Sequence, residues 1–324
     1  MSRVSTNGNY QSALLNLMQA QQTQNEAGER VQTRKNATDL TGYGRGSETL
    51  TALKAADARV QGFLDTGEAV SARLEAQDLA INQIGDGISG AREAIGSVLA
   101  SDSMSTLMLD LEGQFQSVAN GLNYRHQGGY LFAGANTTNQ PVSVGTMAEL
   151  VAAPNVAATL KNDQIKPASR IAENTSVETG YLADGFKFVD PSPPPPAVAG
   201  TPSHIFQIFR DIKAYSDDPA TGPLTGKPTE AQKAFLTTQM KRLEIASTAT
   251  IDIAARNGAL ANRVDSLTTS HEAQQLSLGK LVSARTDVDP LQAVTELQLS
   301  QVAVQASAQV VAKLSEVSLL NFLR

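Results

Sequence analysis

The two ends of this chain lack charged residues over long stretches. No Asp, Glu, Lys or Arg occurs from Val4 to Asn25 or from Leu297 to Ala312. A terminal helix on a soluble monomer normally carries charge on its solvent-facing side. We therefore expect both ends to be buried against other protein, including other copies of the same chain. Both are too polar to cross a membrane, which takes about 20 predominantly apolar residues.

Apolar residues at both ends recur at steps of three and four, the spacing of one face of a helix. The N-terminal repeat is Tyr10, Leu14 and Leu17, and the C-terminal repeat runs from Leu291 to Val317 before an apolar tail. We predict that residues from these repeats form an assembly interface: Tyr10, Leu14, Leu17, Leu299, Val302, Val310, Leu314, Val317, Leu320 and Phe322.

Two longer runs in the middle of the chain carry the same spacing. One extends from Val60 to Val98, about five heptads, and the other from Leu243 to Val288. Alternating steps of three and four over this length indicate a coiled coil. Glycines at 85, 87 and 90 weaken the first run, by roughly 1 kcal/mol each relative to Ala. A shorter helical run, from Met104 to Leu122, follows the first.

Residues between the runs have a different character. Short pieces of alternating apolar residues occur within 129–190, separated by turn residues, which indicates a β-rich insert. The segment Pro191–Pro196 contains five prolines and is interpreted as a stiff polyproline linker. A short amphipathic helix is predicted from Ile205 to Tyr215. We expect the insert, roughly residues 141–204, to be a separate unit that is dispensable for assembly.

The predicted fold is mainly α: a long antiparallel coiled-coil or helical-bundle rod formed by the N- and C-terminal halves, with a small β-rich insert domain. Residues 1–42 and 286–324 are expected to pair as terminal helices. Residues 43–140 and 203–285 are expected to form the coiled-coil rod, and residues 141–202 the β-rich insert with its proline-rich linker.

Composition argues against several classes of function. The chain has no cysteine, so it has no disulfide and no cysteine-based metal site. Its net charge is −6 and Lys and Arg do not cluster, which argues against nucleic acid as a partner. No two of His126, His204 and His271 have the spacing of a metal site, and Gly42–Gly46 is interpreted as a hinge. We predict no catalytic, cofactor or metal site, no membrane partner and no enzymatic activity.

Several strings resemble the bacterial flagellin superfamily. GGYLFAG stands at the end of the N-terminal helical part, and the start of the chain, with Tyr10, is also similar to the family. Further strings stand near the C-terminus; the matching segments are Arg3–Thr6, Gly128–Gly134, Asp287–Leu297, Gln305–Gln309 and Leu319–Leu323. The string that flagellins usually carry after their first helix is absent, and Thr33–Leu40 and Gly42–Gly46 stand in its place. This departure favours the hook-associated members over flagellin itself.

The resemblance implies a structural subunit of the flagellum that joins hook to filament by helical self-assembly through its terminal helices. It also implies that the paired ends, 1–42 and 286–324, form an axial core and are disordered in the monomer, and that the insert at 141–202 faces outward. The alternatives are flagellin, the main filament subunit, and, less favoured, a type III secreted coiled-coil translocator. The implied partners are copies of the chain, the hook-side junction protein, flagellin and a cytoplasmic export chaperone. The first residues contain no hydrophobic core of a signal peptide. The implied location is therefore the extracellular flagellum, reached through type III export without a cleaved signal.

Overall fold

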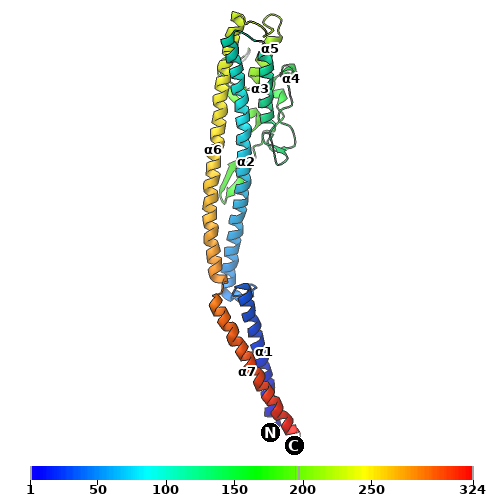
Figure 1. Ribbon diagram of the computed structural model, residues 1–324, viewed down its shortest axis with the longest axis vertical. Coiled ribbons are helices and arrows are strands. Elements are labelled where there is room, and N and C mark those ends of the chain that lie inside the picture. Colours follow the sequence, from blue (N-terminus) through cyan, green and yellow to red (C-terminus); the bar gives the residue numbers. More distant parts are fainter. Residues whose placement is uncertain (1, 194, 196–197, 323–324) are drawn as a thin grey trace. The chain divides into compact units, whose positions relative to one another are not determined.

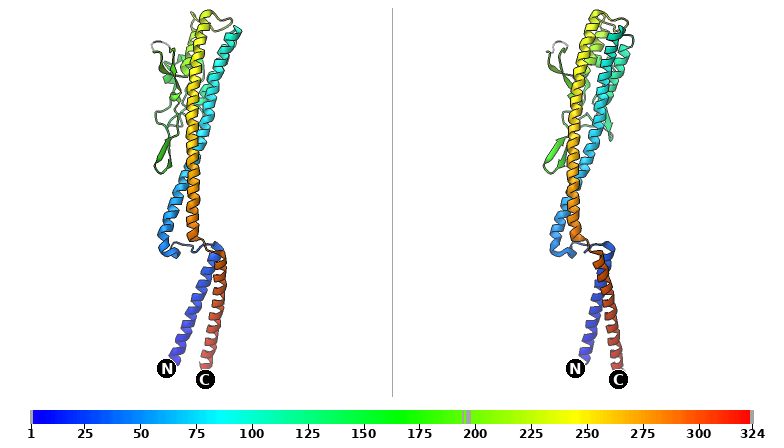
Figure 2. Two further views of the ribbon diagram at one scale, coloured as in Figure 1. Left: turned by 90° about the vertical axis from the view of Figure 1, so that its left-hand side faces the viewer. Right: turned by 60° about the vertical axis from the view of Figure 1, so that its left-hand side comes forward.

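Helices from the N-terminal half of the chain lie beside helices from the C-terminal half, as Figures 1 and 2 show. The computed structural model describes residues 2–193, 195 and 198–322. Their contacts divide the chain into two units: one takes in residues up to 61 and from 273 onward, and the other is 62–272. The mainly α-helical bundle expected from the sequence is confirmed.

The first unit contains the terminal helices. Helix α1 (Ser2–Thr33) and helix α7 (Pro290–Phe322) run antiparallel and contact each other along their length. Proline is tolerated at the first position of α7 because the first amide groups of a helix have no intrahelical acceptor. Asp289 accepts a hydrogen bond from the backbone N–H of Leu291 at 2.9 Å, which caps the start of α7. The short 3₁₀ helix η1 (Thr41–Gly46) then leads into α2.

The two longest helices correspond to the two apolar repeats in the middle of the chain. Helix α2 (Ser47–Ser101) and helix α6 (Glu230–Thr286) follow the two predicted runs, although each begins 13 residues earlier than its apolar repeat. The stretches that precede the repeats are rich in Ala, Leu, Lys and Gln, which are good helix formers with or without a buried face. Within 62–272, Val70 and Leu74 of α2 share a buried cluster with Val264 of α6. These residues belong to the predicted repeats.

Helix α3 (Leu107–Leu122) packs on α2 at a distance that only glycine permits. A Cβ atom built on Gly87 would lie 2.7 Å from Cγ2 of Val118, and one on Gly121 would lie 2.7 Å from Cγ1 of Ile84. Glycine therefore lowers helix propensity here but allows the two backbones to approach. The apolar positions of α3 that face α2 include Leu111, which is completely buried.

The insert is built from three two-stranded antiparallel sheets and short helices. The strand pairs are β1 (Arg125–His126) with β2 (Gly129–Tyr130), β3 (Ala168–Ala172) with β4 (Thr175–Glu178), and β5 (Lys187–Asp190) with β6 (Thr201–His204). The helical elements are α4 (Met147–Ala152), η2 (Val156–Thr159), η3 (Ala183–Gly185) and α5 (Phe206–Asp217). The proline-rich segment connects β5 to β6, so it closes a hairpin rather than linking the insert to the rod.

The insert shares its hydrophobic core with the helices. Met147, Leu150 and Phe186 are at most 1% exposed and belong to the same cluster as Phe115 of α3 and Leu243 of α6. Phe115 also contacts Phe206 of α5, with ring centroids 5.0 Å apart. Removal of residues 141–202 would expose this cluster, so the expectation of a separable insert is not supported by the packing.

Candidate assembly interface on the terminal helices

One face of α1 packs against one face of α7 and forms a narrow seam. The buried or half-buried positions on α1 follow steps of three and four, as do those on α7. The seam consists of Tyr10, Ala13, Leu17, Ala20, Gln24, Ala27 and Val31 on α1, and of Ala293, Leu297, Ser300, Val304, Ser307, Val311 and Leu314 on α7. Ala, Ser and Gln make up half of this set, which lets the helices approach but buries little apolar surface.

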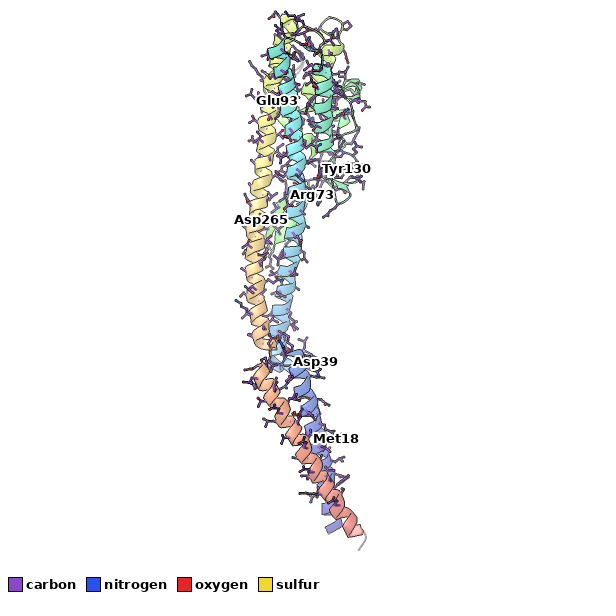
Figure 3. The ribbon with its side chains drawn as sticks, viewed as in Figure 1. Met18, Asp39, Arg73, Glu93, Tyr130 and Asp265 are labelled. Carbon is purple, nitrogen blue, oxygen red and sulfur yellow. The ribbon has the colours of Figure 1, made fainter. Side chains whose placement is uncertain are left out.

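A second apolar stripe lies on the outside of each helix, and we call the two together the outer stripe. On α7 it includes Leu299 and Val302, which are 66% and 62% exposed. On α1 it includes Met18, labelled in Figure 3, at 58%. At 3.6 residues per turn the outer stripe points roughly 150° away from the seam on both helices. Its members are Leu14, Leu15, Met18, Leu291, Val294, Leu299, Val302 and Val310.

The segment after α1 and the segment between α6 and α7 contact each other through a polar cluster that we call the clasp. It consists of Lys35, Asn36, Ser283, Thr286 and Asp287. The carboxylate of Asp287 accepts hydrogen bonds from the Lys35 ammonium and from Ser283 and Thr286, and these lower the pKa of Asp287 to about 2, with Lys35 as the main cause. The Asn36 side-chain amide donates to the backbone carbonyl of Asp287 at 3.2 Å. The clasp fixes where α1 begins to face α7.

An ion pair next to the clasp supports the same register. Nη1 of Arg30 lies 3.2 Å from Oε2 of Glu296. Both side chains are more than a third exposed, so the pair contributes little to stability but specifies which residues face each other. The described part of α7 beyond Glu296 has no charge before Lys313.

The structure places the predicted interface residues on two different faces. Tyr10, Leu17 and Leu314 lie half-buried in the seam, so they already have a partner within the chain. Leu14, Leu299, Val302 and Val310 belong to the outer stripe. The side chains of Val317, Leu320 and Phe322 lie outside the described residues. The predicted repeat thus mixes the seam with the outer stripe.

The seam was missed at sequence level because small residues carry it. Ala27 and Ala293 are the best-buried members, at 4% and 1%, and neither ranks as a strong apolar signal in an alanine-rich helix. A search for small residues at steps of seven, as at Ala13, Ala20 and Ala27, would have found it.

The outer stripe is suited to contact with protein. Apolar side chains alternate there with Gln, Asn and Thr, whose amides and hydroxyls can be buried if they find hydrogen-bond partners. No formal charge between Leu297 and Ala312 has to be desolvated. None of the helices in the described part of the chain is long and apolar enough to span a membrane.

Comparison with known proteins finds a family likeness at the C-terminal end of the chain. Residues 240–323, which cover most of α6 and all of α7, match the family model described as the bacterial flagellin C-terminal helical region. No curated protein matches the sequence.

Solved structures of flagellar proteins share the fold. A protein from Vibrio parahaemolyticus assigned as flagellar hook-associated is 14% identical, with a TM-score of 0.58, and the match covers 76% of this chain and 100% of the other. FlgL of Xanthomonas campestris is 18% identical, with a TM-score of 0.54 and coverage of 71% and 99%. The flagellar junction protein FlgL of Legionella pneumophila is 11% identical, with a TM-score of 0.50 and coverage of 67% and 99%.

Proposed function

We propose that this chain is a structural subunit of the bacterial flagellum that joins the hook to the filament by helical self-assembly through its terminal helices. The observation that carries the proposal is the outer stripe: α1 and α7 each bury one face against the other and leave a second apolar face without a partner in the chain. Each helix has a long stretch without charge, with one apolar face against the other helix and a second apolar face exposed, which is suited to contact a neighbouring copy.

The energetics favour burial of the outer stripe on assembly. Full burial of one Leu, Val or Met side chain contributes about 1.5–3 kcal/mol. Several such residues per subunit, repeated at every contact of a helical array, offset the loss of translational and rotational freedom on association. The pairing of α1 with α7 brings both outer faces into one subunit, so each copy presents two surfaces.

The family and the neighbouring structures support the rest of the assignment. The proposed partners are further copies of the chain, the hook-side junction protein and flagellin, with a cytoplasmic export chaperone before secretion. The proposed location is the extracellular flagellum, reached through the type III export apparatus without a cleaved signal peptide. The proposed role is structural rather than enzymatic.

Flagellin remains the second candidate, because the C-terminal family match is to a flagellin region. The match to structures named as hook-associated and junction proteins favours the junction role. A deletion strain separates the two. Complete hooks without filaments, with flagellin released into the medium, support a junction subunit, whereas loss of the main filament antigen supports flagellin.

The assembly interface is tested by two substitutions on α7. Val302 is in the outer stripe and Val304, two residues on, is in the seam. We expect Val302→Asp to leave the helix content and unfolding of the monomer unchanged but to abolish filament growth when it replaces the wild type in the deletion strain. A buried, unpaired carboxylate at each subunit contact costs several kcal/mol.

Val304→Asp is the matched control. It should loosen α1 from α7 already in the monomer, which is measured as lost helix content by circular dichroism. Normal filaments with Val302→Asp, in a variant that is stable and exported, would rule out the outer stripe as the assembly interface.

A further inference from the structure

A pocket of about 350 Å³ lies within the 62–272 unit. Its walls come from α2, from the hairpin β1–β2 and from the segments that flank β3 and β4. The polar groups that line it include the side chains of Thr66, Arg73, His126, Tyr130, Ser169 and Thr179. Figure 3 labels two of them, Arg73 on α2 and Tyr130 on β2.

No acidic residue lines this pocket, although the chain as a whole is acidic. Arg73 lies in the wall and His126 beside it. A third basic residue, Arg125, stacks over the Tyr130 ring, with its guanidinium carbon 4.9 Å from the ring centroid. The local composition is therefore basic and rich in hydroxyl groups, which suits an anion rather than a cation.

Arg73 itself lacks a counter-charge. Its Nη2 donates to the backbone carbonyl of Leu131 at 3.3 Å, and its buried Nε has no hydrogen-bond partner. Within the described ranges no carboxylate forms an ion pair with it. Burial lowers the pKa of this guanidinium, with no opposing effect from a neighbouring acid. A half-buried charge without a partner is unfavourable.

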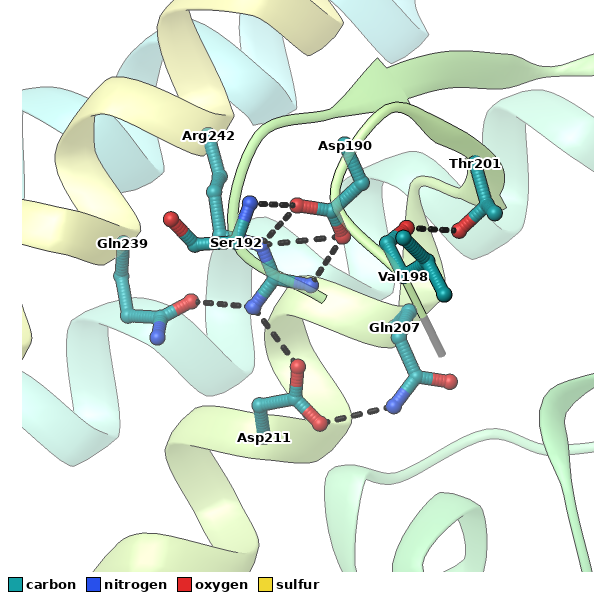
Figure 4. Close-up of polar contacts among 8 residues, drawn as sticks. All are labelled: Asp190, Ser192, Val198, Thr201, Gln207, Asp211, Gln239 and Arg242. Carbon is teal, nitrogen blue, oxygen red and sulfur yellow. Dashed lines mark hydrogen bonds and ion pairs between the residues drawn. The ribbon is translucent and has the colours of Figure 1, made fainter. Parts of the chain in front are cut away.

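Another arginine of the same unit shows how this fold satisfies a buried guanidinium. Arg242 is 1% exposed, and its Nε and Nη2 donate to Asp190 at 3.0 and 2.5 Å. Its Nη1 donates to Asp211 at 2.6 Å and to Gln239 at 2.7 Å (Figure 4). Two carboxylates and an amide thus hold Arg242, whereas Arg73 has one carbonyl and an adjacent pocket.

We propose that the pocket beside Arg73 binds a carboxylate, with the guanidinium as its charged donor and the surrounding hydroxyls as further donors. Guanidinium and carboxylate groups match in shape and form charge-assisted hydrogen bonds. The pocket lies in the size range of small-ligand sites. The carboxylate comes either from a small organic acid or from an acidic side chain of a neighbouring copy; the second source rests on the proposed assembly.

Calorimetric titration of the full chain with succinate, at pH 7 and constant ionic strength, tests the first source. Saturable binding of one equivalent is expected, weakened about tenfold or more by Arg73→Gln. The matched control is Arg92→Gln, which removes an exposed arginine from the same helix and should leave binding unchanged. Since an uncompensated charge is removed, Arg73→Gln should unfold at the same or a higher temperature than the wild type.

Filament assembly by the same variants tests the second source. If succinate does not bind, but Arg73→Gln fails to assemble while Arg92→Gln assembles normally, the carboxylate belongs to a neighbouring copy. The Val302→Asp variant tests the outer stripe alone, so the proposed function and the carboxylate site at Arg73 can each be disproved without the other. The carboxylate site is overturned if Arg73→Gln binds succinate like the wild type, if it unfolds at a markedly lower temperature, or if succinate does not bind and assembly is unaffected.

Discussion

At the scale of single residues, polar side chains in the core act as ties between elements. Asn257 on α6 donates to the backbone carbonyl of Leu74 on α2 at 2.9 Å. A ring nitrogen of His271 lies 3.0 Å from the carbonyl oxygen of Ile171 in β3. Both residues interrupt the predicted apolar repeat of α6, where they weaken packing but select one register. These contacts compensate for burial only in part, because Oδ1 of Asn257 and Nδ1 of His271 are buried without a hydrogen-bond partner among the described residues.

His204 is a buried residue whose protonation opposes folding. Burial lowers the pKa of His204 from 6.5 to about 4, because the hydrogen bond to the carbonyl of Ala183 offsets the loss of hydration only in part. Between about pH 4 and pH 6.5 the imidazole is neutral in the folded chain but protonated in the unfolded chain. Stability is therefore unaffected by His204 above pH 6.5 and declines as the pH falls toward 4.

A His204→Gln variant should lack this pH dependence. Between pH 7 and pH 4.5 we expect the wild type to lose about 2–3 kcal/mol more free energy of unfolding than the variant. Urea unfolding of both proteins at the two pH values measures the difference, and other titrating groups cancel in the comparison. Equal losses in the two proteins would show that the pKa of His204 is the same in the folded and unfolded chain.

At the scale of elements, the contact between α2 and α3 depends on glycines that the sequence marks only as weak points of a helix. Gly87 and Gly121 lie where the two helices meet, and Gly90 lies against the Gln114 side chain. Gly96, on the same helix α2, has no other group within 4 Å of the place where its Cβ would be. Helix propensity predicts the same effect of an alanine substitution at each of these positions, whereas the packing predicts different effects.

Alanine substitutions at Gly87 and Gly96 should therefore have opposite effects. Gly87→Ala is expected to destabilise the chain by about 1–3 kcal/mol, because Val118 and the α3 backbone must move to admit the methyl group. Gly96→Ala should stabilise it by about 0.5–1 kcal/mol through helix propensity alone. Thermal and urea unfolding of the two variants provide the measurement. A stabilising Gly87→Ala would mean that α2 and α3 are not in such close contact.

At the scale of the whole molecule, the two units differ in how much apolar surface they bury. The main hydrophobic cluster lies entirely within 62–272, whereas the seam between α1 and α7 relies on small residues. Ordering a residue costs about 1–2 kcal/mol of backbone entropy. A seam in which half of the residues are Ala, Ser or Gln offsets this cost poorly before a neighbour covers the outer stripe, so disorder of the ends in the free chain remains our prediction.

Limited proteolysis of the purified monomer tests this difference. We expect rapid loss of roughly the first 40 and last 35–40 residues and a resistant fragment that retains the 62–272 unit. Mass spectrometry of the fragments identifies the cleavage sites, and the assembled protein serves as the control in which both ends are protected. Early cleavage between residues 62 and 100, with intact ends, would contradict the prediction.

The sequence alone was enough to predict the features that depend on neighbours along the chain. Apolar repeats at steps of three and four located α2, α3, α6 and α7, because one helical face must be apolar wherever helices pack. The missing charge at both ends predicts burial on more than one side, which stays a prediction. The string that begins at Asp287 lies in the region that matches the flagellin family model. Short strands appeared in the insert where alternation predicted them.

Tertiary structure decided which groups distant in sequence meet. The insert joined the core of the helices because Met147 and Phe186 bury the same surface of α3 and α6 that the repeats expose. Apolar spacing alone could not separate the seam of α7 from its outer stripe, since both faces carry apolar residues and the best-buried positions of the α1 seam are alanines. Likewise, Arg242 forms an ion pair with Asp190, 52 residues away in the sequence, whereas Arg73 forms no ion pair with an acidic residue among the described residues. Such pairings depend on how the elements pack, which no local pattern encodes.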